Sequence, residues 1–252
     1  MEGFQMRWYA VILSLCLLLV VWSPITASDI SKEEILRAVD EIRAPGEDFS
    51  FDIKITSKPR GKNSTVQELT VSIKDGTKSL VKFTHPPENK GRVLLMVGQN
   101  LWIYMPTINK PIRISPRQRL VGQVSYGDVA RVVYSYDYIV ASDQVERVDE
   151  KELIRLSLTP KTKEATYGKI VLWVAAETYK PRKAQFYALS GKLLKTAYYK
   201  GYTEVLGKER PMIIEIHDEL RKGEVSLMEY SHMQAANLPA SYFQKEYLKY
   251  VR

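Results

Sequence analysis

Apolar and polar residues alternate along much of the chain after position 48. The first such stretch places Phe49, Phe51, Ile53 and Ile55 between polar neighbours. Strict alternation is typical of a β-strand that buries one face and solvates the other. The same pattern predicts further strands at 69–74, 79–84, 92–97, 101–105, 112–114, 154–158, 170–174, 184–188, 193–199, 212–217 and 225–227.

Short turns join many of these strands. Asp75-Gly76 is a strong hairpin signal, and 98–100, 190–192 and 221–223 are comparable short connections. Strands joined so tightly must be antiparallel neighbours, because parallel strands need long crossovers. Since a large twisted sheet curls on itself, we expect a mainly β fold of about 11 or 12 strands whose apolar face turns inward.

Three stretches carry a helical pattern instead. Ser31 and Glu34 have capping-box spacing, and apolar residues recur at 35, 39 and 42. The segments 127–134 and 243–251 repeat apolar residues at helical spacing. The first two helices are candidates for a lid over the inward face.

The inward face and the lid together form the candidate binding site for an apolar ligand. On strands, the expected cavity residues are Phe51, Ile53, Leu95, Met96, Trp102, Tyr104, Leu156, Leu172, Phe186 and Ile214, and on the second helix they are Val129, Val132 and Val133. The aromatic pair Trp102 and Tyr104 faces one side of its strand, which suits either a cavity rim or ordinary core packing.

The N-terminus has the parts of a secretory signal. Arg7 precedes an apolar run at 10–22, Ser23-Pro24 breaks it, and small residues end at Ala27. We expect cleavage before Ser28, leaving one domain at 28–252; a membrane anchor is the alternative, although a span needs about 20 apolar residues. The lone Cys16 lies inside the run after Leu15, so we expect neither a lipid anchor nor disulfides in the mature chain.

The chain is basic, with a formal net charge of +8. No acidic residue occurs between Asn89 and Gly127, and six cations do: Lys90, Arg92, Lys110, Arg113, Arg117 and Arg119. Such a patch fits anionic head groups or an acidic partner, or it is a solvated strand edge that deters aggregation. Nucleic acid is not an expected partner of an exported protein.

No constellation in the sequence indicates catalysis. The three histidines lack metal-ligand spacing, and there is neither a nucleophile elbow nor a glycine-rich phosphate loop. We therefore expect no enzyme activity, no metal and no cofactor.

The stretch 84–128 reads THPPENKGRVLLMVGQNLWIYMPTINKPIRISPRQRLVGQVSYGD and resembles the LolA-like outer-membrane lipoprotein-sorting family. The resemblance is carried by Pro86 or Pro87, Lys90, Gly91, Leu95, Trp102, Tyr104, Pro106, Lys110, Arg113, Ile114 and Asp128. It implies an unclosed antiparallel β-barrel with a helical lid over an apolar cavity. The loop 122–126 departs from the serine-aspartate-aromatic run of many relatives.

The leading hypothesis is a soluble, monomeric periplasmic carrier that shuttles acyl chains of a lipoprotein or lipid toward the outer membrane. Its partners would be an inner-membrane transporter and an outer-membrane acceptor. The first alternative is a periplasmic lipid-sensing regulatory module. The second is a cofactor-free enzyme acting on small apolar substrates, which needs a polar constellation inside the cavity.

Overall fold

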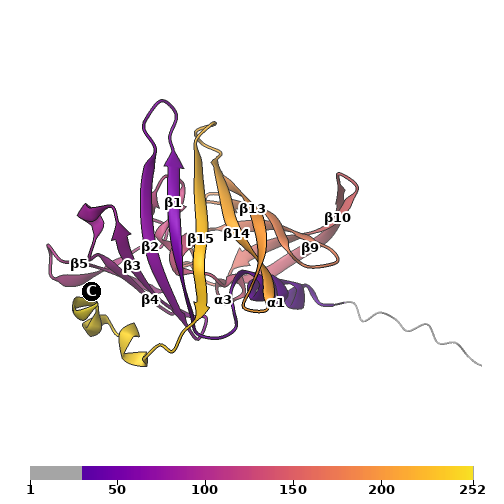
Figure 1. Ribbon diagram of the computed structural model, residues 1–252. Helices are drawn as coiled ribbons and strands as arrows, with labels where there is room; N and C mark the ends of the chain where they lie inside the picture. Colours follow the sequence, from indigo (N-terminus) through magenta and orange to yellow (C-terminus); the bar gives the residue numbers. More distant parts are fainter. Residues whose placement is uncertain (1–29, 252) are drawn as a thin grey trace, which may run out of the picture.

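The computed structural model describes residues 30–251 and consists mainly of antiparallel β-strands (Figure 1). Thirteen strands form one curled sheet in the order β6-β5-β4-β3-β2-β1-β15-β14-β13-β12-β11-β10-β9. The edge strands β6 and β9 do not pair with each other, so the barrel is unclosed. This confirms the predicted fold class, with more strands than the 11 or 12 expected.

The N-terminal half of the sheet contains β1 (Phe49–Lys58), β2 (Thr65–Lys74), β3 (Lys78–His85), β4 (Val93–Val97), β5 (Asn100–Met105) and β6 (Lys110–Ile114). The C-terminal half contains β9 (Tyr138–Val148), β10 (Lys151–Pro160), β11 (Lys169–Ala175), β12 (Pro181–Tyr187), β13 (Leu193–Val205), β14 (Lys208–Asp218) and β15 (Val225–Ala235). Strands β1 and β15 join the two halves.

A separate two-stranded hairpin, β7 (Arg119–Val121) and β8 (Val124–Ser125), packs against this junction. Its turn residue Gly122 has φ 54°, and a Cβ there would clash with the hydroxyls of Ser57 and Ser226. The neighbouring Gln123 N–H donates a hydrogen bond to Ser226 Oγ at 3.0 Å. Glycine is therefore required both by the backbone conformation and by the close approach to β1 and β15.

The strand register places the apolar residues on the concave side of the sheet. One cross-strand row on this side runs Ile112, Ile103, Leu94, Val81, Val71 and Phe51. A second runs Leu156, Leu172, Ala184, Ala197 and Ile216. Both rows belong to one large hydrophobic core.

Helices cover this concave side. The predicted first helix is confirmed as α1 (Lys32–Arg43), with a complete capping box between Ser31 and Glu34. The predicted helix at 127–134 is instead two short helices, α2 (Tyr126–Ala130) and α3 (Tyr134–Asp137), separated by extended residues. Figure 1 shows α1 and α3 together at one end of the barrel, near β9 and β14.

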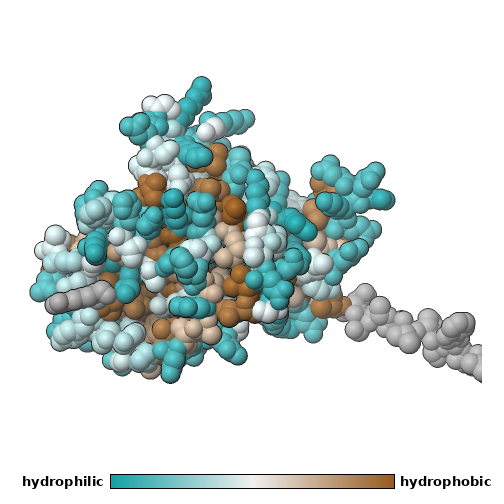
Figure 2. Space-filling view, viewed as in Figure 1, coloured by the Kyte–Doolittle hydropathy of each residue, from teal (hydrophilic) through white to brown (hydrophobic). Residues whose placement is uncertain are grey.

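The C-terminal segment lies on the other side of the sheet. Its 3₁₀ turns, Ala240–Phe243 and Lys245–Tyr250, pack against β3, β4 and β5 and form a second, smaller hydrophobic cluster there. A third 3₁₀ turn, Pro87–Asn89, follows β3. In Figure 2, brown apolar residues show among teal hydrophilic ones over the central strands and near these turns.

The predicted signal peptide at 1–27 lies outside the described residues, so its cleavage and the boundary at Ser28 remain predictions. Within residues 30–251, no helix is long and apolar enough to cross a bilayer.

Candidate functional site

The interior between the curled sheet and its helices holds a small hollow. Its free volume is about 40 Å³, which is room for a few water molecules. Apolar side chains from β11 to β15 line it: Ile170, Phe186, Ala197, Ile214, Ile216 and Met228. A second hollow of about 20 Å³ lies beside it and shares Arg43, Asp128, Ile214 and Tyr230 with the first. We call the two hollows together the inner pocket.

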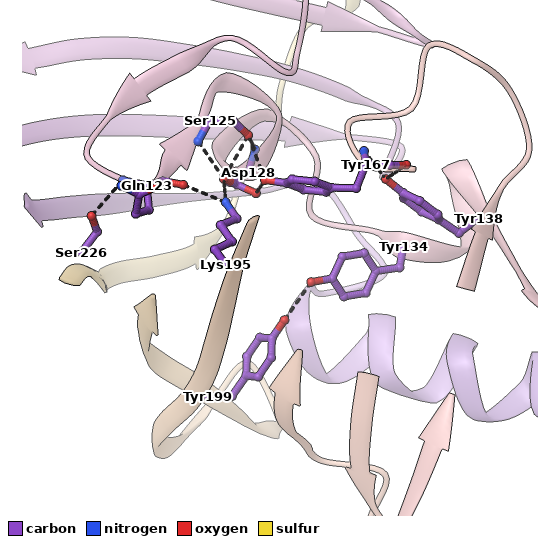
Figure 3. A network of polar contacts seen from close by, with 9 residues as sticks. All are labelled: Gln123, Ser125, Asp128, Tyr134, Tyr138, Tyr167, Lys195, Tyr199 and Ser226. Carbon is purple, nitrogen blue, oxygen red and sulfur yellow. Dashed lines mark hydrogen bonds and ion pairs between the residues drawn. The ribbon is translucent and has the colours of Figure 1, made fainter. Parts of the chain in front are cut away.

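An ion pair is buried on one wall of the inner pocket. Lys195 points inward from β13 in the same row as Phe186 and is only 3% exposed. Its ammonium donates to the Asp128 carboxylate of α2 and to the Gln123 carbonyl oxygen, the latter at 2.9 Å (Figure 3). Burial lowers the pKa of Lys195, although the adjacent Asp128 carboxylate favours the charged form.

Asp128 is the centre of this network. Its Oδ2 accepts the Ser125 N–H at 2.7 Å and the Ser125 hydroxyl at 3.0 Å, and its Oδ1 accepts the Tyr167 hydroxyl at 2.7 Å. Ser125 is the N-cap of α2, so these bonds also fix the start of that helix. Burial raises the pKa of Tyr167, which keeps the phenol protonated as a donor.

Tyrosines and an arginine form the opposite wall. The hydroxyls of Tyr134 on α3 and Tyr199 on β13 point toward each other (Figure 3) and are 2.7 Å apart. Burial raises the pKa of both phenols. The guanidinium carbon of Arg43, in the last turn of α1, lies 3.8 Å from the centroid of the Tyr134 ring. Burial disfavours the Arg43 charge, but the neighbouring Tyr134, Tyr199 and Asp40 groups outweigh it and raise the Arg43 pKa.

Helix α1 is tied to α3 through Asp40. The two Asp40 carboxylate oxygens accept the N–H groups of Tyr134 and Ser135 at 2.6 and 2.7 Å. Asp40 therefore satisfies the free donors at the start of α3, where no residue of α3 itself provides a cap. Because Asp40 is buried, desolvation raises its pKa despite these bonds and nearby Arg43.

Ten of the thirteen predicted cavity residues belong to the large hydrophobic core or pack against it. Phe186 and Ile214 line the larger hollow, and Phe51, Val132 and Ile214 line the smaller one. Five more lie in the large core without facing the hollows: Ile53, Met96, Val129, Leu156 and Leu172. Val133 is partly buried and packs against that core.

The remaining three predicted cavity residues, Leu95, Trp102 and Tyr104, lie on the other side of the sheet. Leu95 pairs with Trp102, and both belong with Tyr104 to the cluster covered by the C-terminal turns, where they contact Phe243 and Leu248. They are not brought to the inner pocket. The prediction missed this because both faces of β4 are buried and those of β5 are buried or half-buried, so apolar character does not reveal which face is inside.

The six predicted patch cations lie between the end of the 3₁₀ turn Pro87–Asn89 and the first residue of β7. Lys90, Lys110, Arg113, Arg117 and Arg119 are exposed and Arg92 is half-buried, and none forms an ion pair within residues 30–251. Arg117 is turned toward the loop before β11, donating to the carbonyl oxygens of Ala165, at 2.8 and 3.0 Å, and Lys163. The other five remain available to a partner.

The polar residues of the inner pocket were not predicted as site residues, although the sequence carries signals for two of them. Arg43 follows Val39 by four residues, so it continues the apolar stripe of α1. Lys195 precedes Ala197 and Tyr199 at strand spacing, so it occupies an inward position. A charged residue on a buried face is the unusual observation in both cases.

The described residues contain no cluster of three or more His, Cys, Asp or Glu side chains able to hold a metal ion. The inner pocket therefore offers a shielded apolar volume, two ion pairs and several phenol hydroxyls. Such an arrangement is suited to binding.

Comparisons with known proteins agree with this architecture. A family model described only as an uncharacterized protein matches residues 75–250. The structure of a LolA superfamily protein from Nitrosomonas europaea is 37% identical, with a TM-score of 0.83 over 86% of this chain and 99% of that one. No curated protein matches the chain.

Two more distant structures share the fold. A putative outer membrane lipoprotein-sorting protein domain from Vibrio parahaemolyticus is 22% identical, with a TM-score of 0.72 over 86% of this chain and 97% of that one. A DUF1329 family protein from Desulfovibrio piger is 21% identical, with a TM-score of 0.71 over the same shares.

Proposed function

The chain belongs to the LolA superfamily, and we propose that it is a non-enzymatic periplasmic carrier that holds acyl chains of a lipid or lipoprotein in the inner pocket. The observation that carries this proposal is the one continuous apolar interior of the curled sheet, closed by short helices and not by a second sheet. Short helices are readily displaced. Each methylene of an acyl chain that the exposed interior then buries would contribute about 0.8 kcal/mol to the free energy of binding.

The inner pocket in this structure is too small for an acyl chain. Its hollows of about 40 and 20 Å³ are far smaller than the roughly 300–1,000 Å³ of a ligand site. An acyl chain therefore requires α1, α2 and α3 to move away from the sheet. In this proposal the five free patch cations contact an anionic membrane surface or the partners that deliver and accept the cargo.

The test uses the chain from residue 28 onward. Purified protein is extracted for lipid mass spectrometry and titrated with a fluorescent fatty acid. We expect co-purified lipid or saturable binding, and the absence of both would overturn the carrier proposal.

Two variants on β13 assign the binding to the interior. Ala197→Leu fills the larger hollow, since Ala197 lines it and is 1% exposed, whereas Lys200→Leu changes an exposed position on the same strand. Binding should fall in the first variant and persist in the second. Equal binding in both would place the ligand outside the inner pocket.

Lid movement has its own readout. Cys16 is the chain's only cysteine and precedes residue 28, so Arg37→Cys on the exposed face of α1 creates a single labelling site. A fluorophore there should change its emission when ligand is added, if α1 moves. An unchanged signal at saturating ligand would refute α1 as part of the lid.

A further inference from the structure

The guanidinium of Arg43 is buried in the inner pocket without a hydrogen-bond partner. The side chain is 11% exposed, and its Nη1 is inaccessible to solvent and donates no hydrogen bond to any carboxylate or carbonyl oxygen among residues 30–251. The nearest carboxylate oxygen, Asp40 Oδ1, lies 3.9 Å from Nη1, which is too long for a hydrogen bond. A buried cation without hydrogen bonds is costly, so this one calls for an explanation.

The other charges of the inner pocket are already paired. Lys195 contacts Asp128, and Arg131 Nε donates to Asp137 Oδ2 at 2.9 Å. The lining thus contains three cations and two carboxylates, and the cation in excess is Arg43. Asp40 lies outside the lining, and each of its oxygens already accepts a backbone N–H of α3.

Arg43 also occupies the boundary between the two hollows. It lines both of them, together with Tyr230 and Ile214. The hydroxyl groups of Tyr134 and Tyr199 lie on the same wall. Guanidinium and phenol donors around a shielded volume are the groups that bind a carboxylate or phosphate, and the guanidinium can do so with two parallel hydrogen bonds.

We propose that the inner pocket selects amphiphiles whose head group is an anion, a carboxylate or a phosphate, and that Arg43 binds this head group inside the barrel. The inference rests on the carrier proposal and narrows its cargo. The closed hollows have room only for a small head group, and the acyl tail would occupy the space next to Phe186, Ile214 and Ile216 that opens when the helices move.

The ligand arms of the test separate charge from chain length. Displacement of a fluorescent fatty acid from the protein is measured with hexadecanoate, hexadecyl phosphate and hexadecanol, each of which has a chain of sixteen carbons in total. Acetate and inorganic phosphate are added as free anions. Because a hydrogen bond to a charged group contributes about 1.5–3 kcal/mol, the two charged amphiphiles should bind about tenfold or more tightly than hexadecanol, and the free anions should not compete.

The protein arms assign this preference to Arg43. Arg43→Met should abolish the preference while leaving hexadecanol affinity nearly unchanged, and Arg43→Lys should retain part of it. Arg37→Met, an exposed arginine on the same helix, should behave like the unaltered protein. Binding of hexadecanol by Arg43→Met also demonstrates that this variant is folded.

The outcomes separate the two proposals. If hexadecanol binds as tightly as hexadecanoate, or if Arg43→Met keeps the preference, the head-group inference is overturned and the carrier proposal stands. Competition by acetate or phosphate alone would overturn the amphiphile as cargo and indicate a site for free anions. If no amphiphile binds at all, both proposals fail.

Discussion

The Asp128–Lys195 pair provides the most direct test of how the interior is stabilised. In Asp128→Asn the side chain keeps its shape but loses its charge. The Lys195 ammonium, 3% exposed, then loses its counter-charge and keeps only neutral acceptors such as the Gln123 carbonyl oxygen. Removing one partner of a buried ion pair costs about 3–5 kcal/mol, because the remaining charge stays uncompensated. We expect the free energy of unfolding to fall by that amount.

The reverse substitution should cost less. In Lys195→Met the Asp128 carboxylate still accepts the Ser125 N–H, the Ser125 hydroxyl and the Tyr167 hydroxyl. The group removed is one whose charged form is already disfavoured by burial, as its lowered pKa indicates. We expect a loss of about 1–3 kcal/mol. The double variant should be more stable than Asp128→Asn alone, because it no longer contains the orphaned cation.

The assay is urea unfolding followed by tryptophan fluorescence, with the slope m compared between variants. Lys200→Met is the matched control, because Lys200 lies on the same strand but is half exposed, and its pair with Glu215 should contribute about 1 kcal/mol or less. The reasoning is refuted if Asp128→Asn costs no more than the control. It is also refuted if Lys195→Met proves the more destabilising of the two buried changes.

Other parts of the fold lead to further expectations. Leu248→Ala should lower the free energy of unfolding by about 2–5 kcal/mol in the same assay, because Leu248 is the fully buried residue of the C-terminal turns. Tyr250→Ala, at a 63% exposed position, should have little effect. Equal effects of the two variants would contradict a stabilising role of these turns. Ser31→Ala should cost about 1 kcal/mol through loss of the α1 cap, and no change would mean that the capping box does not stabilise the helix. Burial raises the pKa of Asp40, so the contribution of this group to the free energy of unfolding is fully present below its unfolded pKa and is lost as pH rises through its folded pKa. The stability advantage of the unaltered protein over Asp40→Asn, measured from pH 3 to 7, should therefore shrink as pH rises. An advantage that widens with pH would contradict this expectation.

Alternation predicts a strand only where the two faces of that strand differ. Strand β1 alternates between buried and exposed or half-buried residues, and its sequence shows this directly. Strand β9 was not predicted, because it is an edge strand with most of its residues exposed on both faces. Hairpin β7–β8 was not predicted either, since its strands are three and two residues long. These three strands are the ones that the sequence pattern does not predict.

The opposite difficulty affects β4. Residues 93–96 are all buried, because the core covers one face and the C-terminal turns cover the other. Periodicity therefore predicts the strand but not its orientation, which is why Leu95 was placed inside. The covering residues Phe243 and Leu248 are more than 130 positions away along the chain. Contacts at that separation follow from the complete topology, which a local pattern does not contain.

Closure of the lid and the environment of Arg43 are linked by the same residues. Separating α1 from α3 breaks both Asp40 hydrogen bonds and removes the Tyr134 ring from the Arg43 guanidinium. Meanwhile Arg210 of β14 holds the end of α1 through the carbonyl oxygens of Glu41 and Ile42, at 2.6 and 3.1 Å. A movement that preserves these bonds leaves Arg43 beside the pocket while the lid opens. In the open form the Tyr134 ring no longer covers the Arg43 guanidinium. An anion that binds Arg43 more tightly in the open form than in the closed form would shift the population toward the open form by that difference in affinity. The head group of the cargo would thus help to keep open the space that its tail requires.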